Sequence, residues 1–176
     1  MKNKIFSILT IISISILLIL FLEIFLKFLY SKENAHYSCY EKVNDERIYI
    51  NGKNCNSVVT YFESEDEIIY ITDEFGNRIK EDGGIKEWNK KIFFVGDSFT
   101  FGSLSNYKYT YPYTSVQTIN KFSNILYKEV NKGVNGYQIS QVLENIKKDE
   151  EISSSNDLII YGLTPNDLFD LKEENI

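Results

Sequence analysis

Histidine, cysteine, proline and tryptophan are scarce in this 176-residue sequence, which holds one, two, two and one of them. With so few histidines and cysteines, no part of the sequence has the ligand spacing of a zinc site, and no residue pattern indicates a cofactor. Basic residues are not in excess either: 25 acidic residues outnumber 19 basic ones, for a net charge of −6. An acidic body repels phosphate backbones, so we expect no nucleic-acid partner. Internal repeats and low-complexity segments are also missing.

One long hydrophobic run is present, at the N-terminus. Ile5–Leu22 has no charged residue, and apolar residues continue beyond Glu23. A bilayer core needs about 20 helical residues, so residues 1–30 are predicted to form one transmembrane anchor that contacts lipid through residues 5–29. The alternative is a cleaved signal peptide, but the run is longer than the usual apolar region of about 7–15 residues, and no small-residue cleavage site follows.

Two cysteines follow this run. Cys39 and Cys55 could form one disulfide in an oxidising compartment, although two unrelated thiols remain an equal alternative. Lysines flank the hydrophobic run on both sides, so the charge signal for its orientation is slight. We expect a single-pass membrane protein with its body outside the cytoplasm.

The remaining residues divide into two regions. Residues 31–90 are polar and irregular and are predicted to form a stalk with a short hairpin and a loop; the hairpin strands are expected at 57–62 and 67–71 and the loop at 72–89. From residue 91, short apolar runs alternate with segments of helical periodicity. Strands are expected at 92–95, 125–130 and 158–161, and helices at 111–122 and 138–148. This alternation predicts a parallel α/β sheet over 91–176. The second helix is expected to face the core with Ile139, Val142, Leu143 and Ile146.

Each of the three expected strands is followed by residues of types that can act in a catalytic or binding site. The first ends in Gly96-Asp97-Ser98, the second leads to Gly133, and the third is followed by Asn166. Each motif alone is also an ordinary turn. In open parallel sheets, however, ligands bind beyond the carboxyl ends of the strands. A serine there can attack an ester, while a glycine N–H and an asparagine amide can stabilise the developing oxyanion.

These residues resemble blocks I, II and III of the SGNH (GDSL-type) hydrolases, a family of esterases and acyltransferases with a flavodoxin-like three-layer α/β/α sandwich. The strings GDSFTFG and NKGVNGYQISQ are similar to those of membrane-anchored envelope members, and residues 72–78 resemble the segment before block I. The resemblance implies that Ser98 is the nucleophile. It also implies an oxyanion hole made by the backbone N–H groups of Ser98 and Gly133 and the side chain of Asn166. Acyl esters, in particular acetyl groups on cell-surface glycan, are the implied substrates.

The sequence departs from that family in two respects. Three residues separate Gly162 from Asn166, where the family commonly has Gly-x-Asn-Asp. The family's general base is a histidine in a C-terminal Asp-x-x-His block, and the sequence reaches Ile176 without one. The single histidine, His36, lies on the expected stalk. We therefore expect the N-terminal part of such an enzyme, nearly inactive unless a C-terminal fragment complements it.

Further expectations concern the sheet edge and two alternative functions. If the strand order is 2-1-3, the apolar strand 158–161 lies at an exposed edge. One alternative to an enzyme is a non-catalytic, membrane-tethered module that binds glycan or a protein on the same fold. The other is a flavodoxin-like anion binder whose loop at 98–102 holds a phosphate.

Overall fold

The computed structural model describes residues 2–30, 39–60, 67–84, 87–153 and 157–165, with the side chains of the first segment described from 10 to 26. The chain divides into two compact units, Met1–Asn34 and Ala35–Ile176. In the first unit, the hydrophobic run forms helix α1 (Lys2–Tyr30). No helix in the described part of the chain is both long enough and apolar enough to cross a membrane. The transmembrane anchor therefore stays a prediction.

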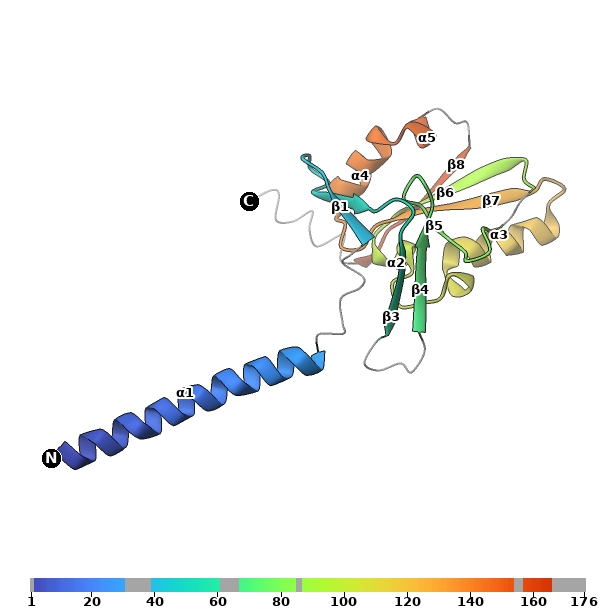
Figure 1. Ribbon diagram of the computed structural model, residues 1–176. Helices are drawn as coiled ribbons and strands as arrows, with labels where there is room; N and C mark the ends of the chain where they lie inside the picture. The colour runs from blue at the N-terminus through green and yellow to red at the C-terminus, as the bar shows by residue number, and fades with distance from the viewer. Residues whose placement is uncertain (1, 31–38, 61–66, 85–86, 154–156, 166–176) are drawn as a thin grey trace. The chain divides into compact units, whose positions relative to one another are not determined.

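The second unit is a mixed α/β domain (Figure 1). Its strands are β1 (Tyr40–Lys42), β2 (Tyr49–Asn51), β3 (Asn56–Thr60), β4 (Glu67–Thr72), β5 (Arg78–Ile79), β6 (Lys90–Gly96), β7 (Tyr127–Gly133) and β8 (Leu158–Gly162). Its helices are α2 (Ser98–Phe101), the short 3-10 turn η2 (Tyr107–Tyr109), α3 (Tyr111–Phe122), α4 (Ile139–Lys148) and α5 (Glu150–Ser153). All five elements expected beyond residue 91 are present, with β7 two residues later at its start and three residues longer at its end than predicted.

Six strands form one sheet in the order β3-β4-β5-β7-β6-β8. The strands β7, β6 and β8 pair in parallel, which confirms the 2-1-3 order of the three expected strands. Beyond β7 the sheet is antiparallel, because β5 pairs with β7 at Arg78 and Asn131 and the β3–β4 hairpin continues from β5. The sheet is therefore mixed rather than wholly parallel.

The expected boundary at residue 91 does not divide this fold. The hairpin that the sequence predicts is confirmed as β3–β4, but it extends the main sheet instead of standing on a stalk. Arg78 lies in the middle of this junction and is completely buried. A short two-residue strand such as β5 carries almost no sequence signal, because the tertiary contact creates it.

Helices cover both faces of the sheet, as Figure 1 shows for α3 on one side and α4 with α5 on the other. On one face Ile92 and Phe94 pack against Val116 of α3. On the other face Phe93 and Val95 pack in a cluster that includes residues of α4 and α5. Consecutive residues of a strand point to opposite faces, so the continuous apolar run of β6 is buried on both sides. This packing is compatible with the expected three-layer α/β/α arrangement.

Helix α4 differs from its expected packing at one position. Val142 is buried and Ile146 packs against the same core cluster, but Leu143 is 49% exposed. In its place Gln141 is buried, forms a capping box with Gln138 and donates a 3.1 Å hydrogen bond to the Arg47 carbonyl. The β1–β2 hairpin thus covers the flank of α4 with polar backbone, which favours an amide side chain there.

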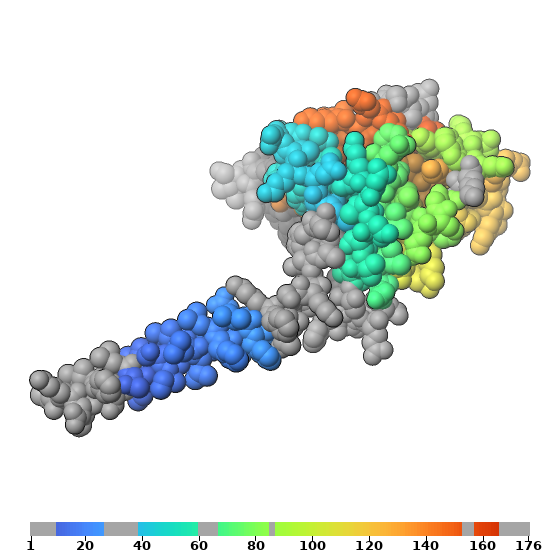
Figure 2. Space-filling model, viewed as in Figure 1, coloured from blue at the N-terminus to red at the C-terminus, as the bar shows by residue number. Residues whose placement is uncertain are grey.

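The β1–β2 hairpin is held in the domain by covalent and polar contacts. Cys39 and Cys55 form a disulfide with their Cα atoms 5.7 Å apart, which confirms the predicted bridge. The Tyr49 hydroxyl donates to the Asn135 carbonyl at 2.6 Å. In the space-filling view this hairpin lies directly beside α4 (Figure 2).

The strand β8 is the last strand of the sheet that the structure describes. Its residues Leu158 and Ile159 are 56% and 42% exposed. The expectation of an exposed apolar edge is therefore confirmed for the described residues.

Candidate functional site

Three glycines lie in register at the carboxyl ends of the parallel strands. Gly96 of β6 pairs with Gly133 of β7 on one side and with Gly162 of β8 on the other. The three strand ends that the sequence singles out therefore share one edge of the sheet, where open α/β folds bind their ligands.

These glycines are required for space. A Cβ on Gly133 would collide with the backbone of Thr100 and Phe101, and a Cβ on Gly96 or Gly162 would collide with the Thr100 hydroxyl. Helix α2 consequently rests directly on the three strand ends. In a close-packed interior such a contact leaves no room for even one methyl group.

Ser98 is the first residue of α2 and is half-buried. The Asp97 side chain caps the helix, with Oδ1 accepting a 2.9 Å hydrogen bond from the Phe99 N–H. Gly102 ends the helix in the left-handed conformation with φ of 82°, and its N–H donates to the Ser98 carbonyl at 2.8 Å. The expected nucleophile thus sits on a short turn that is fixed at both ends.

The segment after β8 is tied to this turn by a side-chain hydrogen bond. The Thr164 hydroxyl donates to Asp97 Oδ2 at 2.9 Å, and both residues are buried. Asn166, the third expected site residue, and His36 both lie outside the described residues. The contact of Thr164 was not predicted, because a threonine before a proline carries no signal of a distant partner.

The Gly133 N–H, for which the resemblance implies an oxyanion role, donates to a side chain of its own strand. It donates a 3.0 Å hydrogen bond to Asn131 Oδ1, while Asn131 Nδ2 donates to the Thr100 carbonyl at 2.9 Å. Asn131 is completely buried, and buried polar groups take the partners within reach. Gly133 supports α2 through its small size, and its N–H donates to Asn131; its part in an oxyanion hole stays a prediction.

The loop after β7 contains Asn135 and Gly136, which belong to the string NKGVNGYQISQ but receive no individual role from it. The Asn135 side chain is hydrogen-bonded to the Ser103 hydroxyl, and the Ser103 N–H donates to the Ser98 carbonyl at 3.1 Å. Gly136 follows with φ of 74° and is exposed. The Asn-Gly pair is a recognised turn signal, and the loop lies between β7 and α4, as the sequence predicts.

Arg78 holds the other side of the turn formed by residues 98–102, hereafter the serine turn. Its Nη1 donates to the carbonyls of Phe101 and Gly102, and its Nη2 donates to that of Ser105, each at 2.6 Å. The guanidinium also lies 4.5 Å from the Tyr70 ring centroid. The guanidinium suits the binding of three carbonyls because it is planar and carries several donors, whereas the ammonium group of a lysine is a compact point charge. The loop that follows Ser98 is therefore held by a buried cation.

A second buried polar pair lies further back along β7. The Tyr107 hydroxyl donates to Glu129 Oε1 at 3.3 Å, and Glu129 Oε2 has no hydrogen-bond partner in the part of the chain that the structure describes. Burial raises the pKa of the Glu129 carboxyl. Burial is also the main cause that raises the pKa of the Tyr107 phenol, with the nearby Glu129 charge adding to it. Neither group is on the serine turn, so the pair bears on stability rather than on chemistry at Ser98.

Within the described residues, no group of three histidine, cysteine, aspartate or glutamate side chains is arranged to hold a metal ion. No family model matches this chain, and no curated protein matches it. Among solved structures, it is similar to the crystal structure of AlinE4, described as an SGNH-hydrolase family esterase, with 26% identity and a TM-score of 0.39 over 49% of this chain and 46% of that one. Two variants of the same esterase give 26% and 24% identity at the same coverage and TM-score. The match spans about half the length of each of these structures.

Proposed function

We propose that this chain carries the nucleophile side of an SGNH-type esterase or O-acyltransferase site, with Ser98 as the nucleophile. The observation that supports the proposal best is the common edge of the strand ends at Gly96, Gly133 and Gly162. The hydrogen bond between Thr164 and Asp97 adds the segment leading to Asn166. Fixed donors beside a serine at this edge suit acyl transfer.

In this proposal the Ser98 oxygen forms a bond to the acyl carbon while a base accepts the hydroxyl proton, and the alcohol of the ester then leaves with a proton. The Ser98 N–H and the Asn166 amide are the proposed oxyanion donors. The Gly136 N–H replaces that of Gly133 as the third donor, since Gly136 is exposed on the loop linked to the serine turn. Asp97 is not the proposed base, because its carboxylate accepts hydrogen bonds from Phe99 and Thr164.

The base is proposed to come from a segment with the sequence Asp-x-x-His, supplied as a complementing fragment. His36 precedes the first strand of the domain by only a few residues and is not assigned this task. The proposed substrates are acyl esters, in particular acetyl esters of cell-envelope glycans. These assignments of base and substrate depend on the family resemblance.

The proposed location is a membrane, with residues 5–29 as a single-pass anchor and the body outside the cytoplasm. The uncharged run Ile5–Leu22 supports the anchor. The disulfide between Cys39 and Cys55 supports an oxidising compartment. Extraction of membranes with alkaline carbonate tests the anchor: the full-length chain should stay in the pellet, and its recovery in the supernatant would contradict the assignment.

The alternative function is a non-catalytic, membrane-tethered binding module on the same fold. The use of the Gly133 N–H by Asn131 favours it.

Hydrolysis of p-nitrophenyl acetate separates the two functions. The chain is assayed alone and with a segment bearing Asp-x-x-His, together with S98A and, as a matched control on α4, S140A. For the enzyme we expect the added segment to raise the rate of hydrolysis. S98A should lower that rate by a factor of about 10² or more, and S140A should leave it unchanged. Hydrolysis that is equal in wild type and S98A under both conditions would favour the binding module.

A further inference from the structure

A cavity lies on the face of the sheet that α4 covers, opposite the face of Gly133 on which α2 packs. Its volume is about 440 Å³, within the usual range of small-molecule sites of about 300–1,000 Å³. The β1–β2 hairpin, the β4–β5 turn and the α4–α5 junction line it, and Lys132 and Val134 form its floor. Side chains alternate along a strand, so Lys132 and Val134 face α4 while Gly133 between them faces α2.

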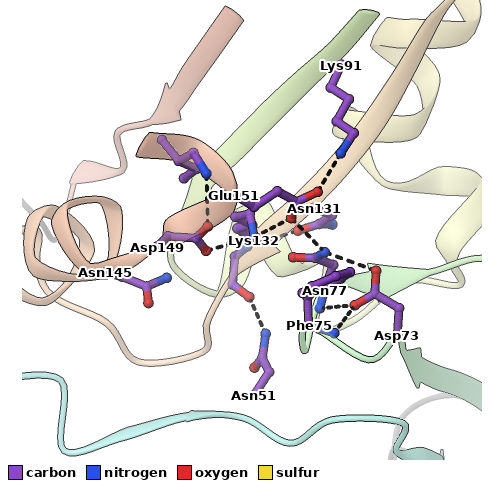
Figure 3. A network of polar contacts seen from close by, with 12 residues as sticks. Asn51, Asp73, Phe75, Asn77, Lys91, Asn131, Lys132, Asn145, Asp149 and Glu151 are labelled. Atoms are coloured by element: carbon purple, nitrogen blue, oxygen red, sulfur yellow. Dashed lines mark hydrogen bonds and ion pairs between the residues drawn. The ribbon is translucent and has the colours of Figure 1, made fainter. Parts of the chain in front are cut away.

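The floor of the cavity is a fixed network of charges. The Lys132 side chain is 4% exposed, and its Nζ lies 2.7 Å from Asp149 and 2.9 Å from Glu151. Lys91 reaches the other oxygen of Glu151 at 2.8 Å (Figure 3). Burial raises the pKa of Glu151, but the hydrogen bonds from Lys91 and Lys132 outweigh it, and the net shift is downward. The carboxylate therefore stays ionised and in place at neutral pH.

The cations at this cavity already have partners, which disfavours an anionic ligand. Arg47 pairs with Asp45 at 2.8 Å, and Lys148 lies 3.2 Å from Asp45 and 2.9 Å from Glu144. A bound phosphate or carboxylate would have to break one of these pairs. Lys53 has no ion-pair partner among the described residues, but it is exposed.

The same pairing disfavours a metal ion. Asp149 and Glu151 share Lys132 between them, so a divalent cation would have to displace a buried ammonium group. A ligand without net charge can form hydrogen bonds with these groups while their ion pairs stay intact. It therefore avoids both the loss of an ion pair and the displacement of the buried ammonium group.

The remaining lining groups suit sugar hydroxyls and a sugar ring. Three asparagines line the cavity. Asn51 and Asn77 are buried and their amide nitrogens donate within the protein, whereas Asn145 is half-buried and its oxygen accepts from Arg47 at 3.4 Å. Asn51 is fixed by a 2.9 Å hydrogen bond from its Nδ2 to the Gly133 carbonyl, and Asn77 by one of 3.0 Å to Asp73. Phe75 adds an aromatic ring that is 60% exposed. Apolar rings beside fixed polar groups bind the CH face and the hydroxyls of a pyranose together.

We propose that this cavity is a binding site for a neutral saccharide. The proposal does not depend on the ester chemistry at Ser98. It gives the chain a place to hold glycan whether or not the serine is reactive.

Isothermal titration of the full chain tests the site. The S98A variant is used in lauryldimethylamine oxide, which has no sugar headgroup, and the probes are maltotriose, cellotriose and chitotriose, with sodium phosphate and calcium chloride as the ionic alternatives. We expect saturable binding of at least one trisaccharide and none of either ion. Failure of all three sugars, or saturable binding of phosphate or calcium instead, would overturn the proposal. Because S98A is used throughout, a failure here says nothing about the esterase proposal.

Variants locate the bound sugar. F75A should weaken binding at least tenfold, whereas F99A, a similarly exposed phenylalanine of α2, should leave it unchanged. K53A should also leave it unchanged, because the proposed ligand has no charge. Phe75 is exposed, so F75A should keep the melting temperature of the parent. Sugar binding that F75A does not change, or that K53A removes, would contradict the assignment.

Discussion

The Thr164 hydroxyl donates a hydrogen bond to the Asp97 carboxylate across 67 positions of sequence, at 2.9 Å. Asp97 uses its other oxygen to cap α2, directly before Ser98. One buried carboxylate therefore joins the ends of β6 and β8. This contact links the turn that carries Ser98 to the segment after β8.

Packing of α2 on Gly133 gives the first prediction. G133A places a methyl group against the backbone of Thr100 and Phe101, so it should lower the free energy of unfolding by about 1–3 kcal/mol, as overpacking does, and displace Ser98. V142A, a core change on α4, is the control with a comparable loss of stability. Urea unfolding and labelling of Ser98 by a fluorophosphonate should show that only G133A reduces the labelling. Equal labelling of G133A and wild type would contradict the packing role.

The three carbonyls held by Arg78 give the second prediction. R78A leaves buried acceptors without donors and should cost at least about 3 kcal/mol of unfolding free energy, at about 1–3 kcal/mol for each buried group left unpaired. R78K should recover only part of this loss, since its ammonium group lacks the planar fork.

Hydrogen exchange separates local from general effects of Arg78. Amides of residues 98–105 should exchange faster in R78K than in wild type, while R47A, a change at the β1–β2 hairpin, should leave them unchanged. Protection of these amides in R78K equal to that in wild type would show that Arg78 does not hold the turn.

The disulfide gives the third prediction. Replacing Cys39 and Cys55 together by serine should lower the unfolding free energy by about 3 kcal/mol, the value expected for a closed loop of about 15 residues. Chemical denaturation with and without reductant provides the measurement. Reductant should destabilise the wild type and leave the double variant unaffected; identical curves for wild type in both conditions would argue against the bond.

Glu129 gives the fourth prediction, which concerns pH. Its pKa is raised by burial, so its stabilising contribution is present at acid pH, below the unfolded value, and is lost as pH rises through the folded value. E129Q should therefore raise the unfolding free energy near pH 7 by about 1 kcal/mol and give no gain near about pH 3, well below the unfolded value of about 4.3, where the carboxyl is protonated in both states.

The control for this pH effect is E144Q on α4. A hydrogen bond from Lys148 lowers the pKa of Glu144, so this variant should not be stabilised at neutral pH. Urea unfolding at both pH values decides the matter. An E129Q gain that is the same at both pH values would mean that ionisation of Glu129 is not its cause.

Some elements could be predicted from sequence because their signal is local. The runs 92–95 and 158–161 are continuous and apolar, which is typical of strands covered on both faces. The helix at 111–122 has proline in its first turn, a position that proline favours. The common edge of the strand ends follows from parallel pairing alone.

Other features depend on contacts that no local pattern shows. The pairing of Arg78 with Asn131 brings the hairpin into the sheet, and hydropathy gives no warning of it because arginine is seldom buried. The exposure of Leu143 follows from the hairpin that covers Gln141. The use of the Gly133 N–H depends on the orientation of the Asn131 side chain, which motif matching cannot supply.

The most direct test of Ser98 as a nucleophile is its rate of modification by a fluorophosphonate, mapped by peptide mass spectrometry on the full chain. Fixed donors stabilise the developing charge even without a base. We therefore expect Ser98 to be modified at least about tenfold faster than Ser140, with T164V slowing the reaction and S98A removing the labelled peptide. Modification of Ser98 no faster than that of Ser140 would contradict the proposed site.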